Sequence, residues 1–113
     1  MHQRDFSTLQ IETVGTVLVV TIAHPTSPLN AVDHALHSDL TRLFSELRRE
    51  TQARAVLLTG RGKAFSAGGD FNWFPELQEP ARMEALRRDA KQLIWDLLDC
   101  EIPIVAAVNG HAM

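Results

Sequence analysis

Short apolar runs alternate along this chain with longer segments of helical period, and this alternation limits the possible folds more than any other feature. Two runs rich in β-branched residues, 9–14 and 17–22, flank a tight turn at Gly15 and predict a hairpin. Two later runs, 55–59 and 104–108, are continuously apolar, as buried strands are in a sheet that is covered on both faces. The chain is therefore predicted to be α/β.

The segments between these runs each carry one apolar stripe, typical of a helix with one buried face. The first helix is expected between 33 and 50, capped by Asn30 or Asp33. The second is expected to begin near Pro80 and to end before Pro103, and residues 109–113 are expected to begin a strand-to-helix turn. Both stripes are predicted to be core: Leu36, Leu40, Leu43, Phe44 and Leu47, and then Met83, Leu86, Ala90, Leu93, Ile94, Leu97 and Leu98.

The composition of the 113 residues, 45% hydrophobic and 22% charged, is typical of one globular domain. A net charge of -3 gives no reason to expect a nucleic-acid partner. No segment approaches the ~20 apolar residues of a membrane span, and the first residues lack a signal-peptide core. The single cysteine, Cys100, excludes an internal disulfide and is expected to be an inert thiol. We therefore expect a soluble, cytoplasmic protein with no membrane contact.

A glycine-rich loop, 60–71, follows the apolar run that ends at Thr59, and ligand sites in α/β sheets favour the carboxyl ends of strands. Two known phosphate-binding motifs are also rich in glycine, but the loop lacks a residue that each of them requires. The dinucleotide fingerprint needs a glycine where Phe65 stands, and the P-loop needs Ser or Thr after Lys63, where the chain has Ala64. The loop is therefore neither of these nucleotide-binding motifs.

Three signatures occur in a fixed order along the chain. The segment 64–70, Ala-Phe-Ser-Ala-Gly-Gly-Asp, matches the pattern Ala-Phe-(small)-Ala-Gly-x-Asp. Upstream stand His24-Pro25 and then Leu-Asn-Ala at 29–31, and downstream stands Ile-Pro-Ile-Val-Ala-Ala-Val-Asn-Gly at 102–110. On these signatures the chain resembles the N-terminal part of the crotonase (enoyl-CoA hydratase/isomerase) superfamily.

The resemblance implies a crotonase-like (ClpP/crotonase) fold of repeated β-β-α units, with residues 1–113 as the N-terminal part of one domain that is incomplete at its C-terminus. It also implies an acyl-CoA-processing enzyme that assembles as a homotrimer or as a hexamer, a dimer of trimers. Hydration of a 2-enoyl-CoA, a lyase reaction of fatty acid metabolism, is the first expectation. Isomerisation, hydrolysis, decarboxylation and dehalogenation are alternatives. A truncated CoA-binding or assembly module is the non-enzymatic alternative, although it would leave the apolar strand at 104–108 uncovered.

The implied reaction explains the residue types in the loop. Chemistry at the α-carbon or the carbonyl of a thioester places negative charge on the thioester oxygen, and a fixed backbone N–H stabilises that charge. By resemblance the first donor is the Gly69 N–H, and the lack of side chains at Gly68 and Gly69 permits close approach. The second donor and the acid/base glutamates would lie beyond Met113, so this stretch is expected to lack a complete active site.

The resemblance also implies where CoA binds. Loop carbonyls face the adenine amino group, basic residues approach the phosphates, and aromatic or histidine side chains near the loop are pocket candidates. CoA is part of the substrate, so no separate cofactor is expected. The residues expected at the substrate and CoA are Ala67, Gly68, Ala64, Arg61 and Lys63, and those of a possible acyl pocket are Trp73, Phe74 and His111.

Two groups of polar residues are expected to be structural. Asp70 follows the glycines and is expected to accept hydrogen bonds from loop amides, not to act as a base. The spacing of Asp33, His34 and His37 can place ligands on one helical face, but zinc needs three or four ligands and no partner cluster is visible. No metal site is therefore expected.

Overall fold

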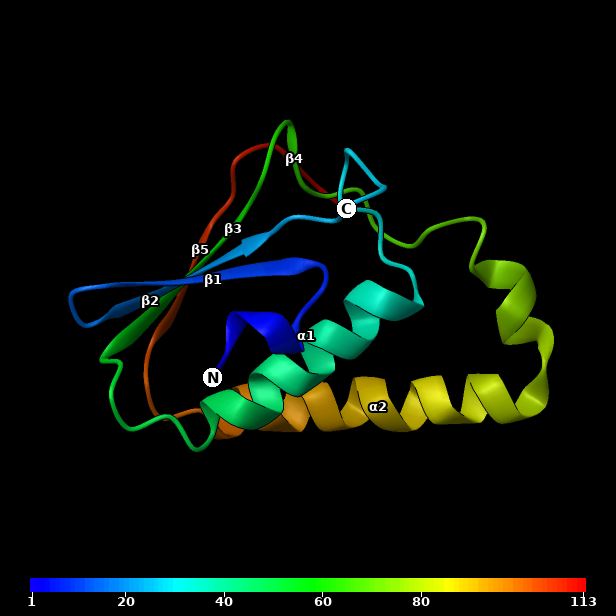
Figure 1. Cartoon of the computed structure of the whole chain (residues 1–113). Coiled ribbons are helices and arrows are strands. Elements are labelled where there is room, and N and C mark those ends of the chain that lie inside the picture. The colour runs from blue at the N-terminus through cyan, green and yellow to red at the C-terminus, as the bar shows by residue number, and fades with distance from the viewer.

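The N-terminal apolar runs form the hairpin expected from the sequence, β1 (Leu9–Val14) and β2 (Val17–Ile22), paired antiparallel. β3 (Ala55–Gly60) joins β2 in parallel, and β5 (Ile104–Ala107) joins β3 in parallel. The computed structural model describes residues 1–113 and gives the sheet order β1-β2-β3-β5 (Figure 1). The α/β prediction is confirmed.

The segments of helical period form α1 (His34–Leu47) and α2 (Pro80–Asp99). Asp33 caps α1, because its Oδ1 accepts a hydrogen bond from the Leu36 N–H at 3.0 Å. Pro80 lies in the first turn of α2, where its missing N–H costs no helical hydrogen bond. Neither helix combines the length and the apolar composition that crossing a membrane requires.

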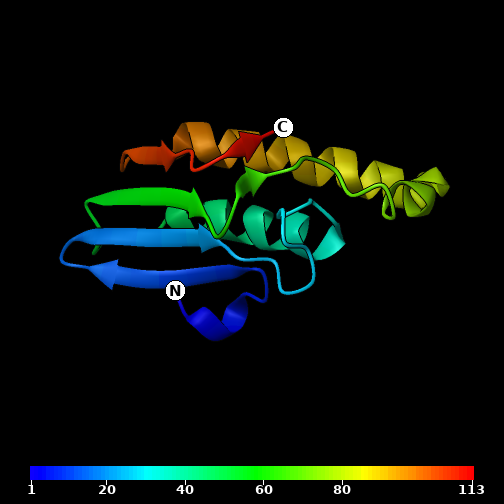
Figure 2. The same cartoon turned by 90° about the horizontal axis from the view of Figure 1, so that it is seen from above.

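Four short elements complete the chain. η1 (Gln3–Asp5) precedes β1, and η2 (Phe74–Gln78) precedes α2. β4 (Ala64–Ser66) and β6 (His111–Ala112) pair in parallel as a separate two-stranded sheet, side by side in Figure 2. Within the expected strand-to-helix turn at 109–113, residues 111 and 112 form the short strand β6, because they pair with β4.

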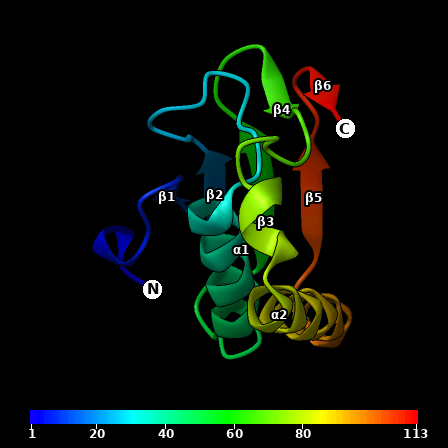
Figure 3. The same ribbon diagram turned by 90° about the vertical axis from the view of Figure 1, so that its right-hand side faces the viewer.

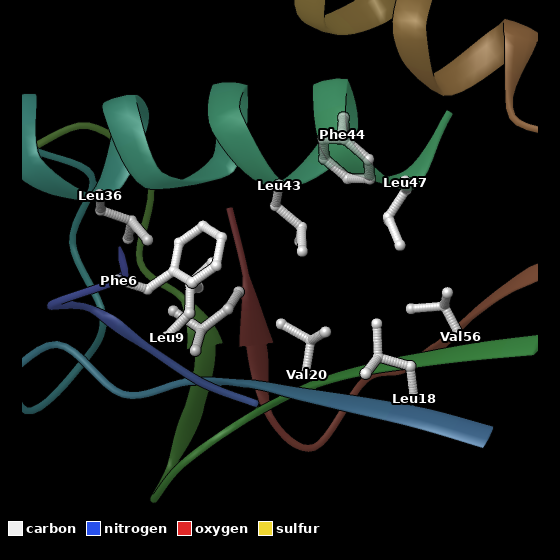
Figure 4. Close-up of a cluster of buried hydrophobic side chains, with 10 residues drawn as sticks. Phe6, Leu9, Leu18, Val20, Leu36, Leu43, Phe44, Leu47 and Val56 are labelled. Atoms are coloured by element: carbon white, nitrogen blue, oxygen red, sulfur yellow. The ribbon is translucent and has the colours of Figure 1, made fainter. Parts of the chain in front are cut away.

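The core lies between α1 and one face of the sheet, as expected for the first stripe (Figure 4). Side chains from α1 point toward the strands, where alternate residues of β2 point back toward the helix. Leu36 and Val20 are both 0% exposed. The cluster consists of Phe6, Leu9, Leu18, Val20, Ile22, Leu36, Leu43, Phe44, Leu47 and Val56.

The sheet is covered on one face only, which corrects the expectation of two covered faces for 55–59 and agrees with the expectation that this stretch leaves 104–108 uncovered. In β3 only Val56 is buried, and Val105 in β5 is 56% exposed. The reason is that α1 and α2 both lie on the same side of the sheet (Figures 1 and 4). Because successive residues of a strand point to opposite faces, every second side chain is left on the uncovered face.

The second apolar stripe is not core, because α2 packs on α1 and not on the sheet. The one buried residue of α2 is Asp96, whose Oδ1 accepts a hydrogen bond from Arg48 Nη1 at 3.0 Å. Leu93 packs against the core cluster, but Ile94 and Leu98 are 52% and 70% exposed. The face of α2 that meets α1 is thus partly polar, and much of the predicted stripe faces solvent.

A pair of leucine truncations tests this one-sided core. Leu43→Ala is expected to lower the free energy of unfolding by about 2 to 5 kcal/mol, because a nearly inaccessible side chain leaves a cavity. Leu98→Ala is the matched control, with an expected change below about 0.5 kcal/mol. Urea unfolding of the 113-residue chain measures both changes, and equal losses would contradict the proposed core.

Candidate functional site

The glycine-rich loop lies at one end of the sheet, past the carboxyl ends of the parallel strands (Figure 3). β3 ends at Gly60, β4 ends at Ser66, and the chain then passes through Gly69 to η2. Loops at this edge of a parallel sheet commonly form the ligand site of an α/β protein. The loop therefore stands where the sequence analysis expects a ligand.

One buried side chain, Asn30, holds this loop to the segment that follows β2. Asn30 is 1% exposed and has a φ of 53°, which asparagine tolerates better than most residues. Its Nδ2 lies 3.3, 3.2 and 3.3 Å from the carbonyl oxygens of Arg61, Ala64 and Phe65. Its Oδ1 accepts from the His24 N–H at 3.0 Å. The β3–β4 connection is thus fixed relative to β2.

A series of hydrogen bonds continues from Asn30 to the glycines. Ser66 Oγ donates to the Asn30 carbonyl at 2.8 Å and accepts from the Gly68 N–H at 3.2 Å. The Ala67 N–H donates to the Leu29 carbonyl at 2.9 Å. The loop backbone is therefore held by the Leu-Asn-Ala segment from residue 66 onward.

The Gly69 N–H donates no hydrogen bond within the chain, and among residues 67–70 it is the one amide left free. On the C-terminal side, the Asp70 N–H donates to the Val32 carbonyl at 2.8 Å. The Val32 N–H in turn donates to the Gly68 carbonyl at 2.7 Å. Gly69 is also exposed, so its N–H is accessible to a ligand.

Glycine at 68 and 69 has a steric reason. Gly68 has a φ of 88°, in the region that side chains disfavour, and an added Cβ would lie 3.3 Å from the Cβ of Met113. At Gly69 an added Cβ would lie 2.9 Å from the ring of Phe74. The ring therefore packs directly against the backbone that carries the free N–H.

The residues expected at CoA differ in their accessibility. The Ala67 carbonyl accepts no hydrogen bond within the chain and is free for a ligand. Ala64 is fully buried, with its carbonyl near the Asn30 amide. Arg61 and Lys63 are exposed, and Arg61 lines an open hollow of about 360 Å³. Gly68 uses its N–H and its carbonyl within the chain.

The three residues expected at an acyl pocket do not converge on one cavity. Trp73 is buried and lines a pocket of about 330 Å³. Phe74 is 42% exposed and meets Phe71 edge to face, with ring centres 5.6 Å apart. His111 is exposed in β6, which pairs with β4. Trp73 thus faces a pocket, whereas Phe74 and His111 border the loop.

Asp70 is a structural acceptor, as expected. Its Oδ1 accepts from the Asn72 N–H at 2.8 Å, and its carbonyl accepts from the Trp73 N–H at 3.0 Å. An aspartate that bonds to an amide two residues later stabilises a turn. Asp70 therefore shapes the exit from the loop.

His24 and Asp33 form a pair that the sequence analysis did not predict. His24 is 5% exposed, its Nε2 lies 2.8 Å from Asp33 Oδ2, and its Nδ1 accepts from the N–H groups of Thr26 and Ser27. Burial opposes ionisation of Asp33, but hydrogen bonds from the Leu36 amide and the His24 ring outweigh it and hold the pKa of Asp33 below its usual value. Since both ring nitrogens are engaged, this pair is structural.

The structure contains no group of three or more His, Cys, Asp or Glu side chains that could hold a metal ion. Asp33 is engaged with His24, and His34 is exposed. The ring of His37 packs against Trp73 with centres 5.8 Å apart. These side chains therefore have other neighbours and do not form a ligand set.

The comparisons with known proteins agree with the fold. A family model described as enoyl-CoA hydratase/isomerase matches residues 12–113. A probable enoyl-CoA hydratase of Rhodobacter capsulatus is 33% identical over 108 residues, which are 95% of this chain and 40% of the relative. The crystal structure of an enoyl-CoA hydratase/isomerase from Mycobacterium paratuberculosis has a TM-score of 0.84 at 40% identity, covering 94% of this chain and 43% of that one. The chain belongs to the enoyl-CoA hydratase/isomerase family and has part of the crotonase fold.

Relatives of this family differ in the reactions for which they are named. A bacillaene synthase decarboxylase of Bacillus subtilis is 33% identical over 85 residues, which are 74% of this chain and 32% of the relative. The chain spans about 40% of the length of the first two curated relatives it matches. Family membership thus establishes the scaffold of an enzyme of the crotonase superfamily.

Sequence reasoning missed the side chains that build the loop. Asn30, Ser66 and Asn109 all lie inside the three signatures, but their bonds depend on contacts between distant segments. Asn109 Oδ1 accepts from the Gly60 N–H, and Asn109 Nδ2 donates to the Gly62 carbonyl, both at 3.0 Å. The available signal was that each signature contains a polar side chain, Asn30, Ser66 or Asn109, in a segment that follows a predicted strand.

Replacement of Asn30 tests its role in holding the loop. Asn30→Asp keeps the acceptor for His24 but removes the amide donors and places a carboxylate among three carbonyls. We expect a loss of about 2 to 4 kcal/mol in the free energy of unfolding. The exposed Asn72→Asp is the control, with an expected change below about 0.5 kcal/mol. Indistinguishable urea midpoints for the two variants would contradict the role of Asn30.

The lowered pKa of Asp33 predicts a pH dependence of stability. Its contribution is present above the unfolded value of about 3.9 and is lost as the pH falls through the lower folded value. Asp33→Asn removes this titration but keeps a capping side chain. Urea unfolding at a series of pH values below about 4.5 should therefore show a shallower acid slope in the variant than in the wild type.

Part of the dependence of the free energy of unfolding on acid pH should remain in Asp33→Asn. The backbone amides of Ala53 and Gln52 lower the pKa of Glu50, which titrates in the same direction. Parallel slopes for the wild type and Asp33→Asn would show that ionisation of Asp33 adds no stability.

Proposed function

We propose that the protein carrying this chain hydrates a 2-enoyl-CoA thioester, with the thioester oxygen bound by the Gly69 N–H. The observation that carries this proposal is the free, exposed amide of Gly69 in a segment whose other amides are engaged. Family membership supports an acyl-CoA substrate, since the family model and the relatives of Rhodobacter capsulatus and Mycobacterium paratuberculosis described above are named for enoyl-CoA. The enzyme would then be a lyase.

The chemistry requires a donor at this position. Water adds its oxygen to C3 and a proton to C2, and in between the electrons of the double bond move onto the thioester oxygen. An N–H that is already oriented stabilises this charge without reorganising, an effect of about 2.7 to 4 kcal/mol per donor. The bonds that fix Gly68 and Asp70 supply that orientation for Gly69.

The rest of the loop supports a site for CoA beside this donor. The free carbonyl of Ala67 is proposed to accept from the adenine amino group, and the exposed Arg61 and Lys63 to approach the phosphates. CoA enters as part of the substrate, so no separate cofactor is proposed. Because CoA is remote from the reacting carbons, its binding energy positions the thioester.

The remaining catalytic groups are proposed to follow Met113 in the longer protein. The Met113 N–H donates to the Ser66 carbonyl at 3.0 Å, and the Met113 side chain lies against Gly68. The residues that follow Met113 therefore start beside the glycine-rich loop. The second donor and the acid/base glutamates that the resemblance implies are proposed to lie among them. Assembly as a homotrimer or a dimer of trimers, and a cytoplasmic location, belong to the same proposal.

Two substitutions at Gly69 test the donor in the protein that carries this chain. Gly69→Pro removes the N–H and is expected to lower kcat for crotonyl-CoA hydration by about 100-fold or more. Gly69→Ala keeps the N–H and is expected to lose far less, because the exposed ring of Phe74 can move away from the new methyl group. Loss of the ultraviolet absorbance of the conjugated thioester measures the rate. Unchanged turnover in Gly69→Pro would rule out this donor.

The choice between hydratase and isomerase is tested with a 3-enoyl-CoA under the same conditions. A hydratase without isomerase activity leaves this substrate unchanged, whereas an isomerase converts it into the conjugated 2-enoyl thioester and raises the absorbance. Conversion of the 3-enoyl thioester without hydration of the 2-enoyl thioester would replace the proposed reaction but keep the role of Gly69.

A further inference from the structure

β1 is the outer strand of the four-stranded sheet, so one of its edges has no neighbouring strand. The Thr8 carbonyl accepts from the Ala23 N–H at 2.7 Å, which shows that the backbone groups of Thr8 point toward the β2 side. Because these directions alternate along an antiparallel strand, the backbone groups of Leu9, Ile11 and Thr13 point outward. Outward groups of this kind can pair with a strand of another molecule.

The side chain of Gln3 occupies two of these outward groups. Its Nε2 donates to the Leu9 carbonyl at 2.6 Å, and its Oε1 accepts from the Ile11 N–H at 2.5 Å. One residue of a parallel strand beside β1 would make the same two bonds, to one carbonyl and to the N–H two residues later. The amide of Gln3 therefore takes the place of a neighbouring strand on the first half of β1.

The segment before β1 is held where Gln3 can reach this edge. η1 lies on the outer side of β1 (Figure 2). Arg42 Nη1 donates to the Asp5 carbonyl at 2.9 Å, and Phe6 is buried in the core. Residues 1–4 are all exposed, and the side chain of Gln3 makes their only hydrogen bonds to the sheet. Loss of this side chain would thus release the first residues from the edge.

A second copy of β1 is the partner that fits the open edge. When two copies run antiparallel about a twofold axis at Ile11, Leu9 of one copy faces Thr13 of the other. Glu12 is the one charged residue of β1, and it then faces a glutamine, so like charges do not meet. This pairing uses the Leu9 carbonyl and the Ile11 N–H, which are the groups that Gln3 occupies.

We propose that the side chain of Gln3 closes the outer edge of β1 against pairing with the β1 strand of a second copy. The strand itself contains no proline or lysine, which are residues that commonly protect an edge, so the protection comes from the segment before it. This role does not depend on the reaction proposed above, because the edge lies outside the glycine-rich loop.

The experiment measures particle mass by size-exclusion chromatography with light scattering, for variants of the longer protein. Gln3→Ala is expected to form particles that contain two or more wild-type assemblies, in a fraction that grows with concentration. Gln52→Ala is the matched control, because the exposed side chain of Gln52 makes no hydrogen bond. This control is expected to keep the wild-type mass.

A double variant, Gln3→Ala with Thr13→Pro, identifies the surface that associates. Proline at 13 removes an outward N–H but no bond to β2, and such a position on an edge strand tolerates proline. In the twofold pair this N–H donates to the Leu9 carbonyl of the other copy, so the double variant should return to the wild-type mass. A wild-type mass for Gln3→Ala would overturn the proposal. Association that persists in the double variant would overturn it as well, because the contact would then lie elsewhere.

Hydrogen exchange in the wild type tests the closure without any association, and it decides the matter even where Gln3→Ala fails to fold. After correction for intrinsic rates, the Ile11 N–H is expected to exchange about 5- to 10-fold more slowly than the outward Thr13 N–H, the effect of about one hydrogen bond. In unassociated Gln3→Ala the two rates should become similar. Equal rates for the two amides in the wild type would show that Gln3 does not close the edge.

Discussion

The loop of this protein depends on the hydrogen bonds of one buried side chain. Asn30 has a left-handed φ and a fully enclosed amide, and it joins the end of β2 to the β3–β4 connection. Its own carbonyl then anchors Ser66, which in turn anchors Gly68. A buried amide left without partners is costly, so these segments are held together and the conformation around Gly69 is restricted.

The free Gly69 N–H follows from how the neighbouring groups are used. A parallel bridge to Val32 takes the Gly68 carbonyl and the Asp70 N–H, and in such a bridge the amide between them points away from the partner strand. Ser66 takes the Gly68 N–H. The donor is therefore positioned by backbone geometry, and no catalytic side chain is needed at that point.

The one-sided core has a different consequence. α1 covers the sheet, and α2 lies on α1 through the contact between Arg48 and Asp96. This arrangement leaves apolar side chains such as Trp95, Leu98 and Val105 more than half exposed. An exposed apolar surface of this kind is typical of a face that contacts further protein.

Local patterns predicted much of the fold, because strands and helices depend on periodicity and on end signals that lie within a few residues. β1 and β2 have the expected bounds, Asp33 caps α1, and Pro80 begins α2. The face that α2 buries was not predictable. The helical period of its apolar residues shows a stripe but does not show which element α2 packs on. That element is α1, and Arg48, directly after α1, makes the contact with α2. The strand pairing of β6 was missed for the same reason, since its partner lies 47 residues earlier at Ala64.

The sequence by itself determined the class of fold, the position of the glycine-rich loop at a strand end and the family, because these follow from local periodicity and from residue types in order. The tertiary structure decided that the Gly69 amide is free, that the Ala67 carbonyl remains open, and that the buried Nε2 of His37 has no partner. The physical reason is that hydrogen-bond satisfaction is a property of all nearby groups together. Those groups come from segments about 30 to 50 residues apart, whose approach is set by packing of the core.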